Sequence, residues 1–275
     1  MNRRNNHLRF SATPRLLRVF LILTAVVALL APMNFVLISP GPASALFPKI
    51  LSIKQADVST YPVHGNLYLL TIYVTNPETR VFGGEVVGCW VWGDCAVLPR
   101  SVMYKDGTTD KKATSDGSKE MSTSQNTALT AAKKFVALNF PSVNVAHLKN
   151  SSVKVALENT GGPSGGLIFT LGLIDLLTPI DIVQGRKIAG TGTIAADGSI
   201  GAIGGVAEKI LGAKKAGASI LFVSTENCSE LPSNTSGITV IAVHTIDQVV
   251  DYLVSNPAHS GVNSAGIRGC ASVGA

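Results

Sequence analysis

The amino-acid sequence predicts a mixed α/β fold, of the α+β kind, behind one apolar N-terminal helix. Three observations lead to this expectation. Strand-like and helix-like patterns alternate closely between residues 152 and 254. An Asp-Gly pair at residues 197–198 separates two apolar stretches, which is typical of a β-hairpin. The run from 19 to 38 is apolar except at three positions. Because strands and helices do not alternate in a regular repeat, a doubly wound sheet is not expected.

Length and charge limit the function classes. With 275 residues, of which 46% are hydrophobic, the chain can bury a real core as one large or two small domains. Five of the 23 basic residues are arginines within the first 18 positions, and setting them aside leaves 18 against 17 acidic residues. The net charge of +6 therefore reflects the N-terminus, and the body is nearly neutral. Basic residues do not gather with aromatic ones, so no nucleic-acid partner is expected.

The apolar run at 19–38 is long enough to cross a bilayer. It predicts a transmembrane signal-anchor behind a basic cytoplasmic tail at 1–18, with the body outside the cytoplasm at the cell membrane. The alternative is a signal peptide cleaved near Ala45, after the small residues Ala43-Ser44-Ala45, and a secreted protein. Both readings place the body where disulfides persist.

Four cysteines follow the apolar run. Cys89 and Cys95 flank a short, turn-like loop, where a bridge could form or be absent. Cys228 and Cys270 lie far apart in sequence, and Cys270 belongs to a Gly-, Ser- and Ala-rich tail at 256–275 that is expected to be disordered. No pairing of these two is expected.

The chain between the apolar run and residue 147 is expected to be β-rich. Residues 39–48 form an extended exit, and 67–74 are rich in β-branched and aromatic residues, as a buried strand is. Residues 105–120 are polar, contain two Asp-Gly pairs and predict a mobile loop within the part at 46–147. A helix is expected at 122–138, where apolar residues recur at helical spacing.

The alternating part is predicted element by element. Strands are expected at 153–157, 188–194, 199–203, 219–224 and 238–243, and helices at 164–177, 206–216 and 246–254. Thr178-Pro179 ends the first of these helices, and Gly217 caps the second.

Ser164 follows a Gly-Gly-Pro turn and stands at the start of a predicted helix. A helix N-terminus offers free backbone N–H groups and partial positive charge, so the serine could act as a nucleophile. The backbone N–H groups of Gly162, Ser164 and Gly165 could then stabilise an oxyanion. The alternative is an ordinary N-cap serine, which is far commoner among proteins.

Lys209 lies at the edge of the apolar face that Val206, Ile210 and Ala213 define, whereas Glu208 and Lys215 are expected to point away. Apolar surroundings lower the pKa of a lysine, as a general base near neutral pH requires. The alternative is a lysine whose stem packs on the core while its ammonium reaches water. Thr191, on a preceding strand, could hydrogen-bond the amine or be an ordinary strand residue.

Other chemistries find less support. Residues 162–166 match a Gly-x-Ser-x-Gly esterase motif, but that fold needs a histidine, and His244 and His259 are poorly placed. Gly190-x-Gly192-x-x-Ala195 leads into a hairpin rather than a helix, so a dinucleotide is not expected. The sequence contains no Walker-type phosphate loop and no cluster with metal-ligand spacing, so no cofactor or metal is expected.

These residues together resemble the proteolytic domain of Lon-type Ser–Lys proteases, and most of all their membrane-anchored bacterial relatives without an ATPase. The matching motifs are Gly162-Pro163-Ser164-Gly165-Gly166-Leu167, Ala189-Gly190-Thr191-Gly192-Thr193-Ile194, Asp197-Gly198-x-Ile200-Gly201-x-Ile203-Gly204-Gly205 and Glu208-Lys209. The resemblance implies a Lon-like proteolytic domain at 148–255 with a fold of the ribosomal protein S5 domain 2 type. It also implies Ser164 as nucleophile, Lys209 as base, Thr191 as the hydroxyl that orients the lysine, protein or peptide substrates, and an assembly that could be a homo-oligomer.

Two departures from the family pattern qualify the resemblance. ATP-driven relatives carry an acidic residue three positions before the serine, where this chain has Gly161. Many anchored relatives insert a PDZ domain that the short interval at 139–151 cannot hold. The sequence therefore predicts an ATP-independent, membrane-anchored serine endopeptidase acting on exposed or membrane-proximal segments. An inactive binding or scaffold domain of the same fold is the alternative.

Overall fold

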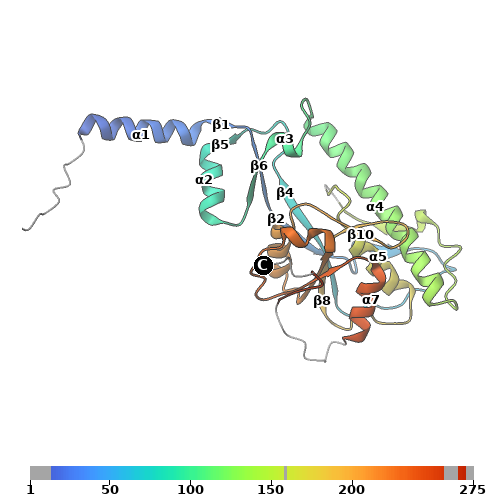
Figure 1. Cartoon of the computed structure of the whole chain (residues 1–275). Helices are drawn as coiled ribbons and strands as arrows, with labels where there is room; N and C mark the ends of the chain where they lie inside the picture. Colours follow the sequence, from blue (N-terminus) through green and yellow to red (C-terminus); the bar gives the residue numbers. More distant parts are fainter. Residues whose placement is uncertain (1–13, 158–159, 257–265, 271–275) are drawn as a thin grey trace, which may run out of the picture.

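The computed structural model of the chain describes residues 14–157, 160–256 and 266–270. Its centre is a seven-stranded sheet in the order β13-β12-β11-β8-β4-β2-β6 (Figure 1). The strands are β2 (Phe35–Ala45), β4 (Asn66–Val74), β6 (Ala96–Pro99), β8 (Lys187–Gly190), β11 (Ile220–Ser224), β12 (Thr239–Val243) and β13 (Gly266–Arg268). Strand pairing is parallel from β4 to β13, and β2 is antiparallel to both β4 and β6. The predicted mixed α/β fold is confirmed, with more parallel pairing than the sequence pattern indicated.

Three two-stranded ribbons complete the β structure. They pair β1 (Pro32–Met33) with β5 (Val81–Phe82), β3 (Leu51–Ile53) with β7 (Val153–Val155), and β9 (Thr193–Ile194) with β10 (Ile200–Gly201). The last is the predicted hairpin, whose turn contains Gly198 at φ +95°. The single strand expected at 188–194 is two strands, because the chain leaves the main sheet after Gly190 and pairs with β10 instead.

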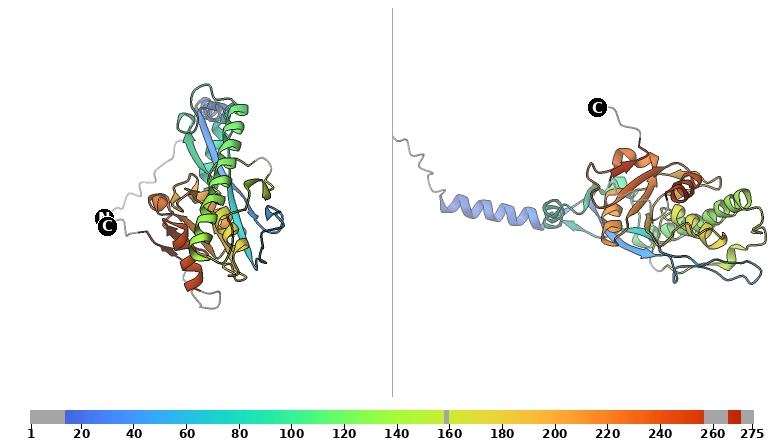
Figure 2. Two further views of the ribbon diagram at one scale, coloured as in Figure 1. Left: turned by 90° about the vertical axis from the view of Figure 1, so that its right-hand side faces the viewer. Right: turned by 90° about the horizontal axis from the view of Figure 1, so that it is seen from below.

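Helices cover both faces of the main sheet (Figures 1 and 2). The helices of the described chain are α1 (Arg15–Leu30), α2 (Gly83–Trp92), α3 (Arg100–Met103), α4 (Asp110–Asn139), α5 (Gly166–Leu177), α6 (Val206–Lys215) and α7 (Ile246–Ser255), with short 3-10 turns at Asn150–Ser152 and Thr225–Glu230. Of these, α4, α5, α6 and α7 pack on the main sheet. Side chains alternate along the strands: Phe222 and Ile241 pack with α4, α5 and α7, whereas Leu221 and Val240 pack with α6. The site elements α5 and α6 thus approach the sheet from opposite faces.

The predicted loop at 105–120 is wrong from Asp110 onward. Helix α4 begins there, with Thr109 as N-cap accepting a hydrogen bond from the backbone of Lys112 at 3.2 Å. Of the two Asp-Gly pairs, Asp106-Gly107 forms the turn before the helix and Asp116-Gly117 lies within it. Burial of the later turns of α4 against α5 supports the whole helix, which its polar first turns could not do alone.

The predicted membrane helix at 19–38 is also wrong in its bounds. Helix α1 ends at Leu30, and Pro32 cannot continue it because proline lacks a backbone N–H. Residues 35–38 belong instead to β2, where Val36 and Ile38 are buried. In the parts of the chain that the structure describes, no helix is both long and apolar enough to cross a membrane. Most of the predicted basic tail, residues 1–13, lies outside the described residues.

Strand β2 bears on the alternative of cleavage near Ala45. The extended conformation expected for 39–48 is present, since β2 runs to Ala45. It lies between β4 and β6 in the main sheet. Cleavage after Ala45 would remove this inner strand and its buried residues from the fold.

Both cysteine pairs form disulfides. Cys89 is bonded to Cys95, but residues 90–92, expected in a turn-like loop, form the last turn of α2, which Gly93 caps at φ +68°. Cys228 is bonded to Cys270, which corrects the expectation that these two do not pair. Strand β13 beside β12 brings Cys270 within reach, so Gly266–Arg268 is ordered. The rest of the predicted disordered tail, 257–265 and 271–275, lies outside the described residues.

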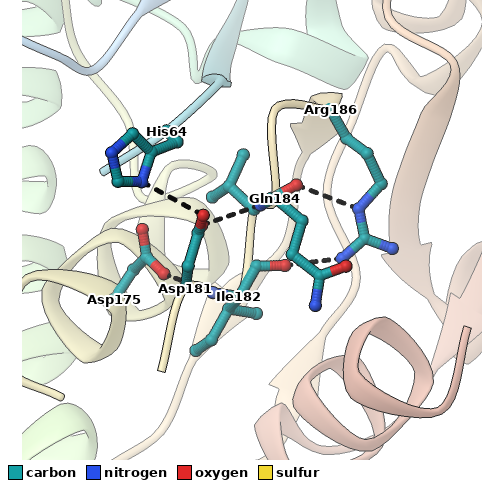
Figure 3. A network of polar contacts seen from close by, with 7 residues as sticks. His64, Asp175, Asp181, Ile182, Gln184 and Arg186 are labelled. Atoms are coloured by element: carbon teal, nitrogen blue, oxygen red, sulfur yellow. Dashed lines mark hydrogen bonds and ion pairs between the residues drawn. The ribbon is translucent and has the colours of Figure 1, made fainter. Parts of the chain in front are cut away.

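A polar network closes the C-terminal end of α5 (Figure 3). Asp175 is only 2% exposed, and its Oδ1 accepts the backbone N–H of Ile182 at 2.8 Å. Its Oδ2 has no hydrogen-bond partner among the described residues. Asp181 alongside contacts His64 Nδ1 at 3.2 Å. Burial raises the pKa of Asp175 to about 6, and the neighbouring charge of Asp181 acts in the same direction.

We expect Asp175→Asn to flatten the pH dependence of stability. The pKa of Asp175 is raised in the folded state from 3.8 to about 6, so the folded chain binds the proton more tightly than the unfolded chain. Wild-type stability should therefore fall by about 2–3 kcal/mol as pH rises from about 4 to 6. Urea unfolding across this range measures it, with the exposed Asp251→Asn as control. Equal slopes in wild type and Asp175→Asn would contradict the assignment.

Candidate active site

Ser164 lies in the loop that leads into α5. The helix begins at Gly166, two residues later than the sequence predicted, with Gly165 as its N-cap. Gly162 precedes the serine at φ +90°, a conformation that glycine adopts without strain. Ser164 is half-buried, whereas Gly165 and Gly166 are buried. The hydroxyl therefore stands at the entrance of a buried helix N-terminus.

The residues that follow β8 hold this loop by hydrogen bonds. The carbonyl of Ser164 accepts hydrogen bonds from the backbone N–H of Gly192 at 3.0 Å and from Oγ1 of Thr191 at 3.3 Å. In return the Gly192 carbonyl accepts the N–H of Leu167 at 3.1 Å. Thr191 is fully buried, and its own N–H is bonded to the carbonyl of Phe222. Thr191 thus orients the serine backbone, a role that the sequence did not reveal.

Helix α4 holds the loop from the other side. The N–H of Gly162 donates to the carbonyl of Gly117 at 2.9 Å, and the buried Ser124 donates from Oγ to the carbonyl of Pro163 at 2.9 Å. A Cβ added to Gly161 would stand 3.0 Å from the backbone of Gly117. The two glycines allow this close approach, which leaves no room for an acidic side chain at position 161. Because 105–120 read as a loop, no signal in the sequence pointed to these contacts.

The three predicted oxyanion donors are not equivalent. Gly162 is wrong as a donor in this conformation, since its N–H is used by Gly117. The N–H groups of Ser164 and Gly165 have no acceptor among the described residues. Both N–H groups lie at the N-terminal end of α5, which carries a partial positive charge. They could therefore stabilise a negative charge that develops on a substrate oxygen near Ser164.

Lys209 lies in the first turns of α6 and is 2% exposed. Its neighbours on the helix face, Val206, Ile210 and Ala213, are buried with it. Burial lowers the pKa of Lys209 to about 8, against the opposing effect of the Glu208 carboxylate. Glu208 was expected to face solvent and is buried instead, whereas Lys215 is exposed as expected. The predicted burial of Lys209 is therefore confirmed, and its role as a base stays a prediction.

The chain before α6 is fixed by the 3-10 turn that follows β11. Asn227 is buried and clamps Ile203 from both sides, accepting its N–H at 3.0 Å and donating to its carbonyl at 2.8 Å. Glu226 accepts the N–H of Ala202 at 2.8 Å. Gly205 then starts the helix at φ +68°, and its carbonyl accepts the N–H of Lys209. These contacts set the position of the lysine along the sheet.

Not every predicted contact is made. In the described part of the chain, no hydrogen bond joins the Ser164 hydroxyl, the Thr191 hydroxyl or an acidic group to the amine of Lys209. Catalytic hydrogen bonds are often long without substrate and shorten when it binds. His244 is exposed at the end of β12, where Gln248 accepts its backbone N–H, and His259 lies outside the described residues. No group of three His, Cys, Asp or Glu within the described ranges could hold a metal.

Two hollows flank the serine loop. A groove of about 970 Å³ runs from Gly161 and Gly162 along α4 to Tyr104, with Met121 and Val155 on its walls. A smaller hollow of about 280 Å³ lies across Pro163, against Ser124 and Ile194. The two hollows touch the serine loop at Gly161, Gly162 and Pro163, and neither is lined by Ser164 or Lys209.

Comparison with known proteins identifies the family of the chain. The family model for the Lon protease (S16) C-terminal proteolytic domain matches residues 91–256, which is more than half of the chain. "Lon protease 2" of Bacillus subtilis (strain 168) is 35% identical over 96 residues, 35% of this chain and 17% of that protein. "Lon protease" of Haemophilus influenzae is 28% identical over 215 residues, 74% of this chain and 26% of that protein. The chain thus spans about a quarter or less of these relatives, and it belongs to the Lon protease C-terminal proteolytic domain family.

Proposed function

We propose that the chain is a serine endopeptidase that hydrolyses peptide bonds with Ser164 as nucleophile and Lys209 as general base. The observation that carries the proposal is the amine of Lys209, which is buried on α6 and has its pKa lowered to about 8. An amine with such a pKa is partly neutral near physiological pH and can accept a proton from an alcohol. A lysine whose ammonium is solvated would keep a pKa near the ordinary value and would be charged at physiological pH.

The reaction follows from the residues around the serine. The Ser164 hydroxyl gives its proton to the neutral amine of Lys209 as its oxygen attacks the peptide carbonyl. The N–H groups of Ser164 and Gly165 stabilise the resulting oxyanion. Protonated Lys209 then gives its proton to the leaving amine, and water releases the acyl group by the reverse sequence. The hollows on both sides of the loop hold the substrate in an extended conformation.

The proposed catalysis does not depend on ATP bound by this chain, because the sequence contains no phosphate-binding loop of the Walker type. Substrates would then have to enter as exposed or unfolded segments. The open groove along α4, rather than a PDZ domain, would receive them.

We further propose that α1 anchors the chain at a membrane and that the catalytic domain lies outside the cytoplasm. None of the residues of α1 is buried, although nearly all are apolar. A helix that is apolar all round is stable only in apolar surroundings. Its length of about 24 Å is less than a bilayer core, a mismatch that local thinning can accommodate. Two disulfides favour an oxidising compartment.

An inactive binding domain of the same fold is the second candidate. One observation favours it, namely that no hydrogen bond joins Ser164 and Lys209 in this structure. A fluorophosphonate probe separates the two candidates, because it labels a serine only when that serine is activated. Labelling that is lost in Ser164→Ala supports the protease, and a chain that stays unlabelled is the inactive domain.

Substitution of either proposed catalytic residue should abolish cleavage. We expect the full chain to cleave a flexible protein such as casein, and Ser164→Ala and Lys209→Ala to lose at least about a thousandfold in kcat/KM. Since only the neutral amine is a base, activity should rise with pH to a midpoint near 8. Undiminished cleavage by either variant, or a rate that does not change between pH 6 and 9, would refute the mechanism.

Burial of an amine that must stay partly charged should lower stability. The folded-state pKa of Lys209 is about 8 and the ordinary value is 10.5, so the cost is full below pH 8 and disappears as pH rises to 10.5. Lys209→Met should therefore raise the free energy of unfolding at pH 7 by about 1–3 kcal/mol while abolishing cleavage. Urea unfolding measures this. The exposed Lys215→Met is the control, and a stability gain equal to that of the control would contradict the burial argument.

The contact of α4 with the serine loop should matter for rate. Ser124→Ala removes the hydrogen bond to the Pro163 carbonyl and leaves the lysine untouched. We expect kcat to fall about tenfold, because the loop loses alignment, while the pH midpoint stays near 8. The control is Ser115→Ala, exposed on the same helix. A shifted pH midpoint, or a kcat equal to that of the control, would show that α4 does not position the loop.

A further inference from the structure

Helix α2 meets the end of α1 and runs across its axis rather than alongside it, between α1 and the body of the molecule (Figures 1 and 2). The contact is close. A Cβ added to Gly83 would stand 2.1 Å from the carbonyl of Ala28, and one added to Gly84 would stand 3.4 Å from that of Leu29. The N–H of Gly83 also donates to the carbonyl of Ala31 at 3.1 Å. The direction of α2 relative to α1 is therefore fixed by the backbone.

The face of α2 that touches α1 continues without cover. Gly83 is followed at helical spacing by Val87, Trp90 and Val91, which lie on the same side of the helix. Trp90 is 83% exposed, and both valines are exposed. The buried Cys89 lies on the opposite side and fixes the end of α2 through its disulfide to Cys95. An apolar surface thus points in the direction from which α1 arrives.

The apolar face of Val87, Trp90 and Val91 carries no charged residue, although charged residues lie before and after it in the sequence. Residues 86–92 carry no charge. Glu85 is turned back to accept the N–H of Phe82, and Asp94 follows the glycine that caps the helix. Trp92 is 79% exposed but lies on the side of the helix away from Trp90, with its ring over Gly88. The pattern is that of a short helix lying flat at an apolar boundary, with tryptophan at the level where polar and apolar surroundings meet.

We propose that the face of Val87, Trp90 and Val91 on α2 lies in the interfacial layer of the lipid bilayer in which α1 is anchored. This inference rests on the proposed anchoring by α1. The occupant is lipid rather than protein, because α1 exposes apolar side chains on every side and the α2 face is continuous with it. A protein partner would cover one side of α1, whereas lipid covers all sides and the adjoining face together. The helix would then set the catalytic domain at a fixed height above the membrane.

The chain itself supplies the probe. It contains two tryptophans, and both are in α2. Trp90→Phe and Trp92→Phe each leave one tryptophan, whose fluorescence reports its surroundings. The full chain is reconstituted in vesicles of equal parts phosphatidylcholine and phosphatidylglycerol that carry a nitroxide either near the top or near the end of the acyl chain. Aqueous iodide serves as the third quencher.

We expect Trp90 to be quenched several-fold more strongly by the shallow nitroxide than by the deep one, and to be protected from iodide. Trp92, which lies on the side of α2 away from Trp90, should be quenched less by lipid and more by iodide than Trp90. Equal exposure of both tryptophans to iodide, with no lipid quenching, would overturn the proposal. Protection from iodide and from both nitroxides would also overturn it, since a second copy or another protein would then cover the face.

Separate readouts keep this failure distinct from failure of the proposed function. Resistance of the vesicle-bound chain to alkaline carbonate reports anchoring by α1, and casein cleavage by the same sample reports the active site. Anchored, active protein with exposed tryptophans overturns only the α2 proposal, whereas loss of vesicle binding overturns both anchoring and the α2 proposal. In addition, Trp90→Ser should weaken vesicle binding several-fold relative to Leu138→Ser, which removes another strongly exposed apolar side chain, at the far end of α4. Equal binding of the two variants would count against the proposal.

Discussion

The docking of the serine loop between α4 and the end of β8 is the constraint on which the site depends. The two backbones meet closely at Gly161 and Gly117, where a Cβ on Gly161 would stand only 3.0 Å from the backbone of Gly117. The backbone of Ser164 is then held by Thr191 and Gly192 on the sheet side. With both sides fixed, the N–H groups of Ser164 and Gly165 have no acceptor among the described residues, as the proposed stabilisation of an oxyanion requires.

The burial of Lys209 affects both the stability of the fold and the pKa of the amine. An amine on the apolar face of α6 weakens the fold whenever it is charged, and the same desolvation brings its pKa to about 8. The hydrogen bonds of Asn227 to Ile203 and the positive φ of Gly205 fix the start of α6 and with it the position of Lys209. Strain of this kind is expected where a fold supports a reaction.

The N-terminal part of the chain connects the proposed membrane contact to the catalytic fold. Only the short strand β1 separates α1 from β2, which enters the main sheet, so a few residues join the apolar helix to the body of the fold. The run at 19–38 looked uniform in sequence because strands buried in a sheet and helices in lipid are both apolar. Pairing with β4 and β6 decides where one ends and the other begins.

The sequence by itself determined the elements whose patterns are local: the hairpin at Asp197-Gly198, the strands and helices after residue 152, and the apolar face that carries Lys209. It also marked Ser164 as the start of a helix. Tertiary structure decided the rest. Helix α4 exists in its polar first half because later turns pack on α5, Cys270 reaches Cys228 because β13 joins the sheet, and Gly162 is held by a residue 45 positions earlier. Such contacts join residues far apart in the chain, so a local sequence pattern does not include both partners and cannot predict the contact.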